Sequence, residues 1–245
     1  MTKYVLSYGG GLNSTALLVF LIKNRYPLDM VIFADTGGEF KHTYETVNYY
    51  KKYANDRGIR FEIVKSELSD SLYEYLYTKK IVPSILRRDC TSKFKISPMR
   101  KLMRSTYGKP EKFIQYIGID YGESHRVMSN DVKYIQNQYP LVDNKIDREQ
   151  CKQILLNENL PVPEKSGCTF CMFTSRKNWI KLLNENPSLF AKAVELEQNA
   201  DRYPDRAGLL HNIPLIKVKN MEKGNTKIED YLTEPSCDVS GSCFL

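Results

Sequence analysis

The order of apolar runs in the first half of the chain constrains its fold most strongly. Residues 3–7 form a β-prone run, three consecutive glycines follow at 9–11, and residues 15–23 have the apolar pattern of a buried helix. Further strands are predicted at 30–34, 60–64 and 113–119, and further helices at 42–55, 70–79 and 97–105. Strands that alternate with helices are typical of a doubly wound α/β fold with a mainly parallel, Rossmann-like sheet.

This alternation stops near residue 138. The remainder contains several prolines, five of the six cysteines, and helical patterns at 148–157, 176–183 and 188–198. We therefore predict two parts: an α/β domain over residues 1–138 and a smaller helical, cysteine-bearing region over 139–245. The second part is expected to gain stability from a metal centre or from packing on the sheet.

Composition excludes several classes of protein. The 245 residues are 42% hydrophobic and 27% charged, which excludes disordered and collagen-like chains. The longest apolar run, 16–22, is far shorter than the roughly 20 residues of a membrane span, and no secretory leader is visible at the N-terminus. We expect a cytoplasmic protein with no membrane partner and with reduced thiols, so its six cysteines favour metal binding or redox chemistry.

The net charge of +7 is a weaker indication. It suits a phosphate-rich partner such as a nucleotide or a nucleic acid, and it equally suits a mildly basic surface with no such partner.

The glycine loop between the first strand and the first helix is the first candidate site. Consecutive glycines let backbone N–H groups converge on an anion at the N-terminus of a helix. The loop is not a Walker A motif, because no Gly-Lys-Ser/Thr follows, and a tight turn alone would also use glycine. The candidate phosphate-binding residues are Ser7, Tyr8, Gly9, Gly10, Gly11, Asn13, Ser14 and Thr15.

A C-x-x-C pair at Cys168 and Cys171 is the second candidate site. Such a pair serves zinc, an iron–sulfur cluster or a redox dithiol. A thioredoxin-like role is disfavoured because the pair follows a proline-rich loop rather than a first strand.

Residues 7–15 (SYGGGLNST) resemble the PP-loop of the adenine nucleotide α-hydrolase superfamily, and more narrowly its phosphoadenosine phosphosulfate reductase-like branch. Segments that resemble this branch follow in the same order at 33–44, 88–98, 118–126 and 165–171. The resemblance covers residues 4–179. Two positions depart from the motif: Gly9 replaces a usual Ser, and Asn13 replaces a usual Asp. The backbone donors remain, but the role of that carboxylate in placing a metal ion or water does not carry over.

The resemblance implies ATP with Mg²⁺, or an adenylyl-sulfate nucleotide, bound at the strand ends and cleaved beside the α-phosphate. Ser14 would contact the pyrophosphate, Asp35 the ribose or Mg²⁺, and Arg126 the charge that develops on phosphate oxygens. Loop capping for Asp35 and a solvated charge for Arg126 are the alternatives. Glu123 would hold Mg²⁺ or orient Arg126, and the remaining nucleotide-binding candidates are Thr36, Gly37 and Gly118.

The resemblance also implies a [4Fe-4S] cluster on Cys90 and the C-x-x-C pair, with Cys151 as our predicted fourth ligand. Zinc on the same thiolates is the main alternative, and unlinked core cysteines are another. If only Cys90, Cys168 and Cys171 bind, one iron is open and could carry sulfur, as in cluster-dependent tRNA thiolation enzymes.

Two further cysteines, Cys237 and Cys243, lie in the Gly/Ser-containing C-terminal tail. Adenylyl-sulfate reductases carry a nucleophilic cysteine on such a tail, so Cys243 is a catalytic candidate, although the Glu-Cys-Gly-x-His pattern of that tail is absent. A persulfide or disulfide pair, a second metal site and incidental thiols are the alternatives.

Three functions follow, in order of preference. The first is an ATP pyrophosphatase that adenylates an acceptor, with nucleic acid expected, for iron–sulfur-dependent sulfur incorporation such as DNA phosphorothioation or tRNA thiolation. A cysteine desulfurase and other subunits of a modification system are its expected partners. The second is a phosphoadenylyl-sulfate or adenylyl-sulfate reductase that uses Cys243 and thioredoxin. The third, which Asn13 makes conceivable, is a non-catalytic nucleotide-binding regulatory subunit.

Overall fold

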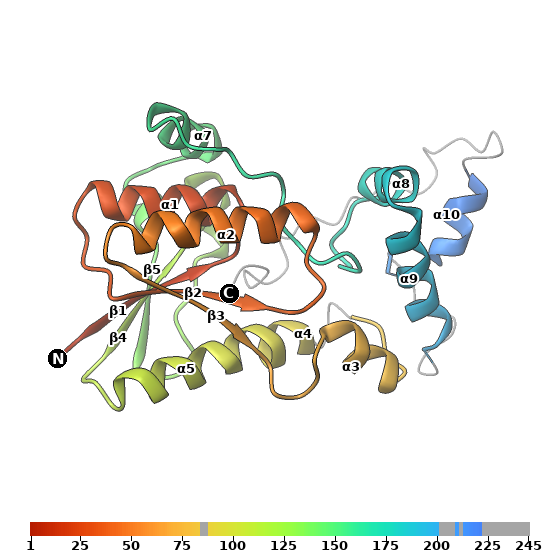
Figure 1. Cartoon of the computed structure of the whole chain (residues 1–245), viewed down its shortest axis with the longest axis horizontal. Helices are drawn as coiled ribbons and strands as arrows, with labels where there is room; N and C mark the ends of the chain where they lie inside the picture. Colours follow the sequence, from red (N-terminus) through yellow and green to blue (C-terminus); the bar gives the residue numbers. More distant parts are fainter. Residues whose placement is uncertain (84–87, 201–208, 211–212, 222–245) are drawn as a thin grey trace.

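A parallel sheet forms the centre of the larger part of the molecule (Figure 1). The computed structural model describes residues 1–83, 88–200, 209–210 and 213–221. Its five-stranded sheet has the order β3-β2-β1-β4-β5, and every neighbouring pair is parallel. The strands are β1 (Lys3–Tyr8), β2 (Met30–Asp35), β3 (Arg60–Lys65), β4 (Phe113–Ile117) and β5 (Ile135–Gln138). The predicted doubly wound α/β fold is confirmed.

The strand order reverses beside β1, which lies between β2 and β4. In the strand register, Ser7 near the end of β1 pairs with Ile32 in β2 and with Ile117 in β4. These strands therefore end at the same edge of the sheet. In open α/β sheets, ligands bind in the crevice at the carboxyl edge where the order reverses. The glycine loop follows β1 at this position.

Helices cover both faces of the sheet. Figure 1 shows α1, α2 and α7 on one face and α5 on the other. The helical elements of the described residues are α1 (Leu12–Lys23), α2 (Lys41–Asn55), α3 (Leu72–Thr78), α4 (Asp89–Thr91), the π-helix η1 (Ser92–Ile96), α5 (Ser97–Tyr107), the 3₁₀ segment η2 (Tyr121–Arg126), α6 (Pro140–Asp143), α7 (Arg148–Asn157), α8 (Arg176–Glu185), α9 (Pro187–Gln198) and α10 (Leu215–Met221).

The main hydrophobic core lies between the sheet and the layer of α1, α2 and α7. Leu6, Leu17 and Val31 are fully buried there, together with Cys151 and Leu155 from α7. Helix α7 therefore packs on the sheet domain, although it lies beyond the predicted boundary at residue 138.

A second core joins α8, α9 and α10 to α3 from the first half of the chain. Trp179 and Phe190 are among its largest buried side chains. Their rings pack edge to face, with the ring centroids 6.2 Å apart. These two cores each contain residues from both sides of position 138, whereas the core between the sheet and α5 contains only residues before it. The division into two domains stays a prediction. Asn186 and Pro187 separate α8 from α9, since proline has no N–H to continue the first helix.

Six of the elements in the described residues were absent from the sequence prediction: α4, η1, η2, β5, α6 and α10. Strand β5 pairs with β4 through its backbone from Ile135 to Gln138. The π-helix η1 widens the turn between Cys90 and α5, a distortion that is frequent at functional sites. Among the described residues, no helix is long and apolar enough to cross a membrane.

Candidate nucleotide and cysteine site

The glycine loop is held in shape by Ser14. The backbone N–H of Gly9 donates to Ser14 Oγ at 3.2 Å, and this hydroxyl donates to the carbonyl of Gly11 at 3.1 Å. Gly10 has a φ of +72°, and a Cβ there would lie 2.9 Å from Thr43 Cγ2, so this position requires glycine. The loop therefore has a fixed backbone with its N–H groups at the start of α1.

Gly118, directly after β4, closes the other side of the crevice. A Cβ at this position would lie 2.7 Å from both the backbone N and the Cα of Ser14. Any side chain at residue 118 would displace the first turn of α1. This close approach explains why glycine stands at the strand end.

A polar cluster joins α1 to the 3₁₀ segment η2. The amide of Asn13 donates to Asp120 Oδ2 at 2.8 Å and to Glu123 Oε2 at 3.3 Å. Glu123 Oε1 forms an ion pair with Arg126 Nη1 at 2.8 Å, and Arg126 is only 2% exposed. The structure thus brings Asn13, Glu123 and Arg126 together, as the predicted site requires, and adds Asp120.

Asp35, at the end of β2, is engaged within its own turn. It accepts hydrogen bonds from Gly37 N and from the Tyr44 hydroxyl, each at 2.8 Å, and pairs with Lys65 at 3.4 Å. Burial and the bond to Asp35 raise the pKa of Tyr44. Thr36 donates to Glu39 at 3.0 Å. This turn places Asp35 and Glu39 at the same sheet edge as the glycine loop.

Three of the predicted nucleotide-binding side chains point elsewhere. Tyr8 and Thr15 form a 2.9 Å hydrogen bond with each other inside the core, and Ser7 Oγ donates to Met99 Sδ at 3.8 Å on the α5 face. Any contact of Ser7, Tyr8 or Thr15 with a nucleotide in this conformation is therefore made by the backbone.

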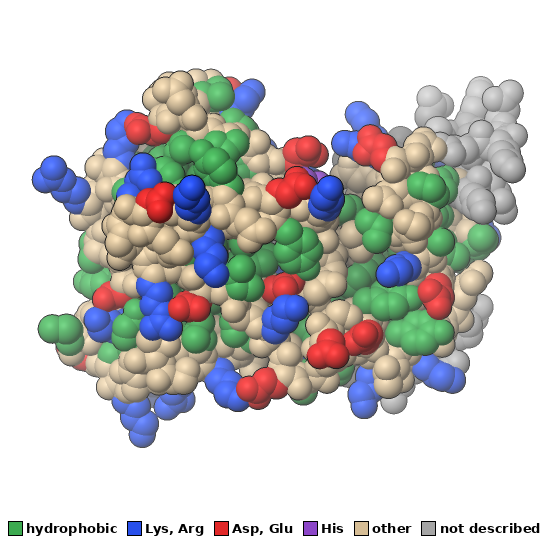
Figure 2. Space-filling view, viewed as in Figure 1, with side chains coloured by type: hydrophobic (Ala, Val, Ile, Leu, Met, Phe, Trp, Pro, Cys, Tyr) green, Lys and Arg blue, Asp and Glu red, His purple; other side chains and the backbone are tan. Residues whose placement is uncertain are grey.

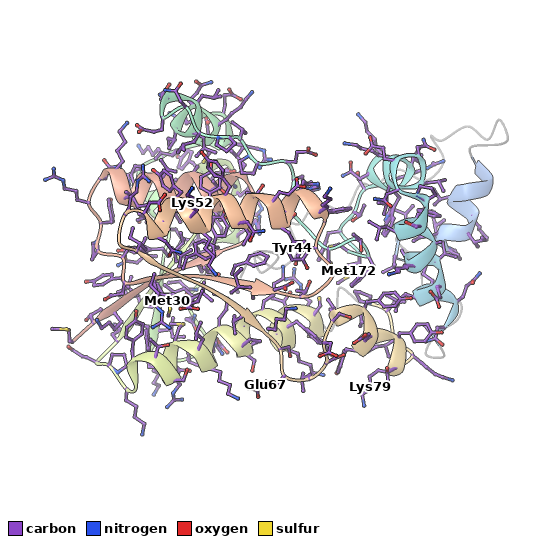
Figure 3. All side chains as sticks on the ribbon, in the orientation of Figure 1. Met30, Tyr44, Lys52, Glu67, Lys79 and Met172 are labelled. Atoms are coloured by element: carbon purple, nitrogen blue, oxygen red, sulfur yellow. The ribbon has the colours of Figure 1, made fainter. Side chains whose placement is uncertain are left out.

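The loop that carries the C-x-x-C pair docks on the turn after β2. Phe40 N donates to Gly167 O at 3.1 Å, Thr169 N donates to Gly38 O at 2.9 Å, and Glu39 forms an isolated bridge with Cys168. A Cβ on Gly11 would lie 2.6 Å from Ser166 Oγ, so this loop also contacts the glycine loop. Figure 3 labels Tyr44 on α2 and Met172 in the segment before α8, the two sides of this junction.

A cavity of about 350 Å³ lies at the junction. Gly9 and Thr36 from the sheet edge line it together with Cys90, Cys168 and Cys171. The cavity is large enough for a small-molecule ligand. Gly9 at the start of the glycine loop and three cysteines therefore line the same cavity.

The three cysteines interact with one another and with Lys95. A hydrogen bond with Cys171, together with burial, raises the pKa of Cys168, and burial raises that of Cys90. Burial disfavours the Lys95 ammonium, yet the Glu39 carboxylate at 3.7 Å and the nearby thiols raise its pKa overall. Lys95 therefore stays charged and favours negative charge on the sulfurs, which are partly buried.

Cys151, the predicted fourth ligand, lies in the main core on α7. It is fully buried, and burial raises the pKa of its thiol to about 12, with Asp120 and Arg148 as its nearest charges. Cys90, Cys168 and Cys171 line one cavity, whereas Cys151 lies apart from them because helical periodicity turns it inward with Leu155. Within the described residues, no group of three or more His, Cys, Asp or Glu side chains is positioned to hold a metal ion. Cys237 and Cys243 lie outside the described residues.

Sequence reasoning missed Asp120 and Glu39. Asp120 accepts from Glu123 N at 3.2 Å as the N-cap of η2, and the Asp-x-x-Glu spacing was the available signal. Glu39 is 8% exposed and lies between Thr36 and Lys95. A buried carboxylate in a Gly-rich turn gives no comparable signal in the sequence.

Known proteins resemble this chain in sequence and in fold. An uncharacterized protein of Methanocaldococcus jannaschii, MJ0973, is 23% identical over 206 residues, which cover 78% of this chain and 46% of that protein. The chain thus spans about half the length of this curated relative.

Two solved structures are similar at low sequence identity. Phosphoadenylyl-sulfate reductase from Candida auris, in a phosphate complex, has a TM-score of 0.47 and 18% identity over 68% of this chain and 80% of that one. The U34-tRNA thiolase NcsA from Methanococcus maripaludis, with its [4Fe-4S] cluster, has a TM-score of 0.48 and 15% identity. This match covers 80% of this chain and 71% of that one.

A family assignment rests on sequence alone. Residues 3–138, which include every strand of the sheet and the glycine loop, match the phosphoadenosine phosphosulfate reductase domain. More than half of the chain lies in this match, and the chain therefore belongs to the phosphoadenosine phosphosulfate reductase domain family.

Proposed function

We propose that this chain is an ATP pyrophosphatase that activates an acceptor for sulfur incorporation. ATP would bind with Mg²⁺ at the glycine loop, and an acceptor oxygen would attack the α-phosphorus while the bond to the β-phosphate breaks. The products are pyrophosphate and an adenylated acceptor. One observation carries this proposal: Gly9 of the glycine loop and the three cysteines line one cavity.

The phosphate-binding part of the proposal rests on the loop. The N–H groups of Gly10 and Gly11 would bind the pyrophosphate, assisted by the N-terminus of α1. Gly9 N–H and Ser14 Oγ would join them after exchanging the hydrogen bonds that they make within the loop. Arg126, held by Glu123, would stabilise charge on the phosphate oxygens, because a buried guanidinium interacts strongly with anions. Asp35 would bind the ribose or Mg²⁺ after exchanging its hydrogen bond from Tyr44.

The sulfur part of the proposal rests on the cysteines. Cys90, Cys168 and Cys171 offer the thiolate donors that iron–sulfur clusters and zinc prefer, and the charged Lys95 compensates their negative charge. A [4Fe-4S] cluster held by three cysteines would supply an iron that can accept sulfur. A cysteine desulfurase would deliver this sulfur, and a nucleic acid, DNA or tRNA, would be the acceptor.

Pyrophosphate release from ATP tests the proposal. Wild-type protein with Mg²⁺ is expected to release pyrophosphate, and Ser14→Ala to lose most of this activity because the loop loses two hydrogen bonds. Ser69→Ala is the matched control, since its hydroxyl donates to Glu74 at 3.5 Å and the residue is not part of the cavity lining. Equal rates for the two variants would contradict the assignment of Ser14.

A second function is favoured by the family match. A phosphoadenylyl-sulfate or adenylyl-sulfate reductase would need a nucleophilic thiol, for which Cys243 is the candidate, and thioredoxin as reductant. Cys243→Ser abolishes activity under that function and leaves pyrophosphate release intact under ours. A protein that releases no product from either nucleotide would instead be a regulatory nucleotide-binding subunit.

A further inference from the structure

A second cavity, of about 190 Å³, lies between α5 and the strands β4 and β5, on the face of the sheet that α5 covers (Figure 1). Four residues between 96 and 103 line it from η1 and α5, Gln115 lines it from β4, and Asn137 from β5. The loop 128–131, between η2 and β5, forms the third wall. We name it the Gln115 cavity. It shares no lining residue with the cavity that contains Gly9 and the cysteines.

Gln115 is a polar residue in the middle of a buried strand. All five residues of β4 are buried, and the other four are aromatic or aliphatic. Gln115 itself is 7% exposed, and it pairs in the strand register with Val5 of β1 and Asn137 of β5. Its side-chain amide makes no hydrogen bond to any residue that the structure describes. Because burial of an unpaired amide is unfavourable, this side chain indicates a binding partner inside the cavity that it lines.

Water alone suits the Gln115 cavity poorly. A buried water molecule needs two to four polar partners, and much of the lining is apolar: Ile96, Met99, Met103 and Met128. A thioether sulfur is only a weak acceptor. A ligand that combines an apolar ring with a polar edge satisfies both the methionines and the amide.

The loop wall of the cavity is fixed in place by hydrogen bonds to β5 and to the residue after it. Asn130 Nδ2 donates to Asn137 Oδ1 at 2.9 Å, and Asn137 Nδ2 donates to Met128 O at 3.1 Å. The Tyr139 hydroxyl also donates to Met128 O, at 2.6 Å. The cavity is therefore formed before a ligand binds, which lowers the entropic cost of binding.

The charges at the Gln115 cavity offset each other. Arg100 and Asp131 are the charged residues of its lining, and Arg100 donates to Asp131 at 3.2 Å and to Asn130 at 2.9 Å. Figure 2 shows a similar mixture on the face that it draws, where Lys and Arg side chains lie next to Asp and Glu side chains. A paired guanidinium and carboxylate favour an uncharged ligand over an anion or a cation.

We propose that the Gln115 cavity binds an uncharged pyrimidine ring, the class of heterocycle to which the nucleobases uracil and cytosine belong. The amide of Gln115 would donate to and accept from adjacent groups on the edge of the ring, as amide side chains do when they read a base. Met99 and Met103 from α5 and Met128 from the loop would contact the ring, because thioether sulfurs interact favourably with aromatic systems.

The size of the cavity favours a single ring. An apolar cavity of about 150 Å³ admits a ring as large as benzene. Sites for drug-sized ligands begin at about 300 Å³. A volume of about 190 Å³ therefore suits one six-membered ring with its exocyclic oxygens and is too small for a whole nucleotide.

One contact relates the Gln115 cavity to the glycine loop. Met99, which lines the cavity, accepts a hydrogen bond from Ser7 Oγ at 3.8 Å, and Ser7 lies two residues before Gly9. A ring in the cavity would therefore contact a side chain that is bonded to the end of β1. The inference goes beyond the proposed function and does not depend on it, since the two cavities have separate linings.

Two ligands of nearly the same shape test the inference. In 1-methyluracil an N–H donor lies between two carbonyl acceptors, and 1,3-dimethyluracil lacks this donor. Isothermal titration of the wild type, without ATP, is expected to show about tenfold tighter binding of 1-methyluracil. Gln115→Leu should bind 1-methyluracil about tenfold more weakly and should bind the two ligands alike, which separates the lost hydrogen bond from the bulk of the added methyl group.

Gln136→Leu is the matched control, because Gln136 on β5 accepts from Lys112 at 3.0 Å and does not line the cavity. It should bind both ligands as the wild type does. Gln115→Leu is also expected to melt at a temperature at least as high as the wild type, because an apolar side chain of similar size replaces an unpaired buried amide.

Three results overturn the inference: no saturable binding of 1-methyluracil by the wild type at millimolar concentration, equal affinity in Gln115→Leu, or a lower melting temperature of Gln115→Leu, which would give the amide a structural role. Gly118→Ala, which alters the glycine loop, should keep its affinity for 1-methyluracil. Loss of that affinity would place the ring in the nucleotide site and overturn the inference as well. Pyrophosphate release from ATP is measured separately, so failure of one proposal leaves the other standing.

Discussion

The side-chain amide of Asn13 lies 2.8 Å from Asp120 Oδ2, and it bridges the first turn of α1 to the segment that carries Arg126. A carboxylate at position 13, as the PP-loop motif usually has, would repel Asp120. The amide therefore suits the acidic partners that this chain places opposite it, and the departure from the motif has a local structural reason.

Asn13→Asp is expected to destabilise the protein at pH 7 by about 1–3 kcal/mol, because two hydrogen bonds become contacts between like charges. The measurement is the free energy of unfolding by urea. Asn13→Ala is the control, which loses the bonds without adding charge and should be destabilised less. An Asp variant as stable as the wild type would show that the three side chains do not interact as described.

Gly118→Ala is expected to lower the affinity for ATP at least tenfold while the protein stays folded. The added methyl group would lie 2.7 Å from the backbone of Ser14, and the glycine loop must move to make room. Isothermal titration with a non-hydrolysable ATP analogue checks this. Unchanged affinity would mean that the crevice between β1 and β4 is not the nucleotide site.

The burial of Glu197 is expected to make the free energy of unfolding depend on pH. It is 9% exposed, and it accepts backbone hydrogen bonds from Leu209 at 2.5 Å and from Leu215 at 2.7 Å. Burial raises its pKa from 4.5 to about 7, so the folded protein binds this proton more tightly than the unfolded chain does. The contribution of Glu197 to the free energy of unfolding is complete below pH 4.5 and is lost as the pH rises toward and through 7.

The test is a comparison of urea unfolding at pH values between 4.5 and 7. The wild type should lose stability from this residue as the pH rises, and Glu197→Gln should lack that component, although it is less stable throughout because its amide cannot accept both bonds. Parallel pH curves for the two proteins would contradict the role of Glu197.

Substitutions of the different cysteines are expected to change the metal content of the protein to different extents. After anaerobic purification, Cys90→Ser and Cys168→Ser should each lose most of the bound metal, since both line the cavity. Cys151→Ala should retain it and lose only about 1 kcal/mol of stability through core packing. Iron, sulfide and zinc analysis decides the identity of the metal, and a colourless protein with one zinc per chain would exclude the cluster. Loss of metal in Cys151→Ala would contradict the placement of α7.

The elements that were predicted from the sequence carry their signal in their own residues. All six residues of β2 are buried, and the first five, 30–34, form a continuous apolar run. The glycines after β1 mark the turn into α1. Strand β5 contains one buried residue, Ile135, and exists through its backbone pairing with β4. No local pattern could indicate it.

The site was predictable only where residues act through motifs. The C-x-x-C pair was identified from its spacing and Cys90 by the resemblance, and all three cysteines line one cavity. Cys151 was assigned to them because it is a cysteine near a proline-rich loop, yet it lies one helical turn from the buried Leu155, and this spacing already indicated the core.

The central claim is that the glycine loop and the cysteine cavity serve ATP-dependent activation of an acceptor. Anaerobically purified wild-type protein, assayed in parallel with ATP and with adenylyl sulfate, tests it most directly. We predict that it releases pyrophosphate from ATP, and that Ser14→Ala does not. Sulfite release from adenylyl sulfate with no pyrophosphate from ATP would contradict the claim and establish the reductase function instead.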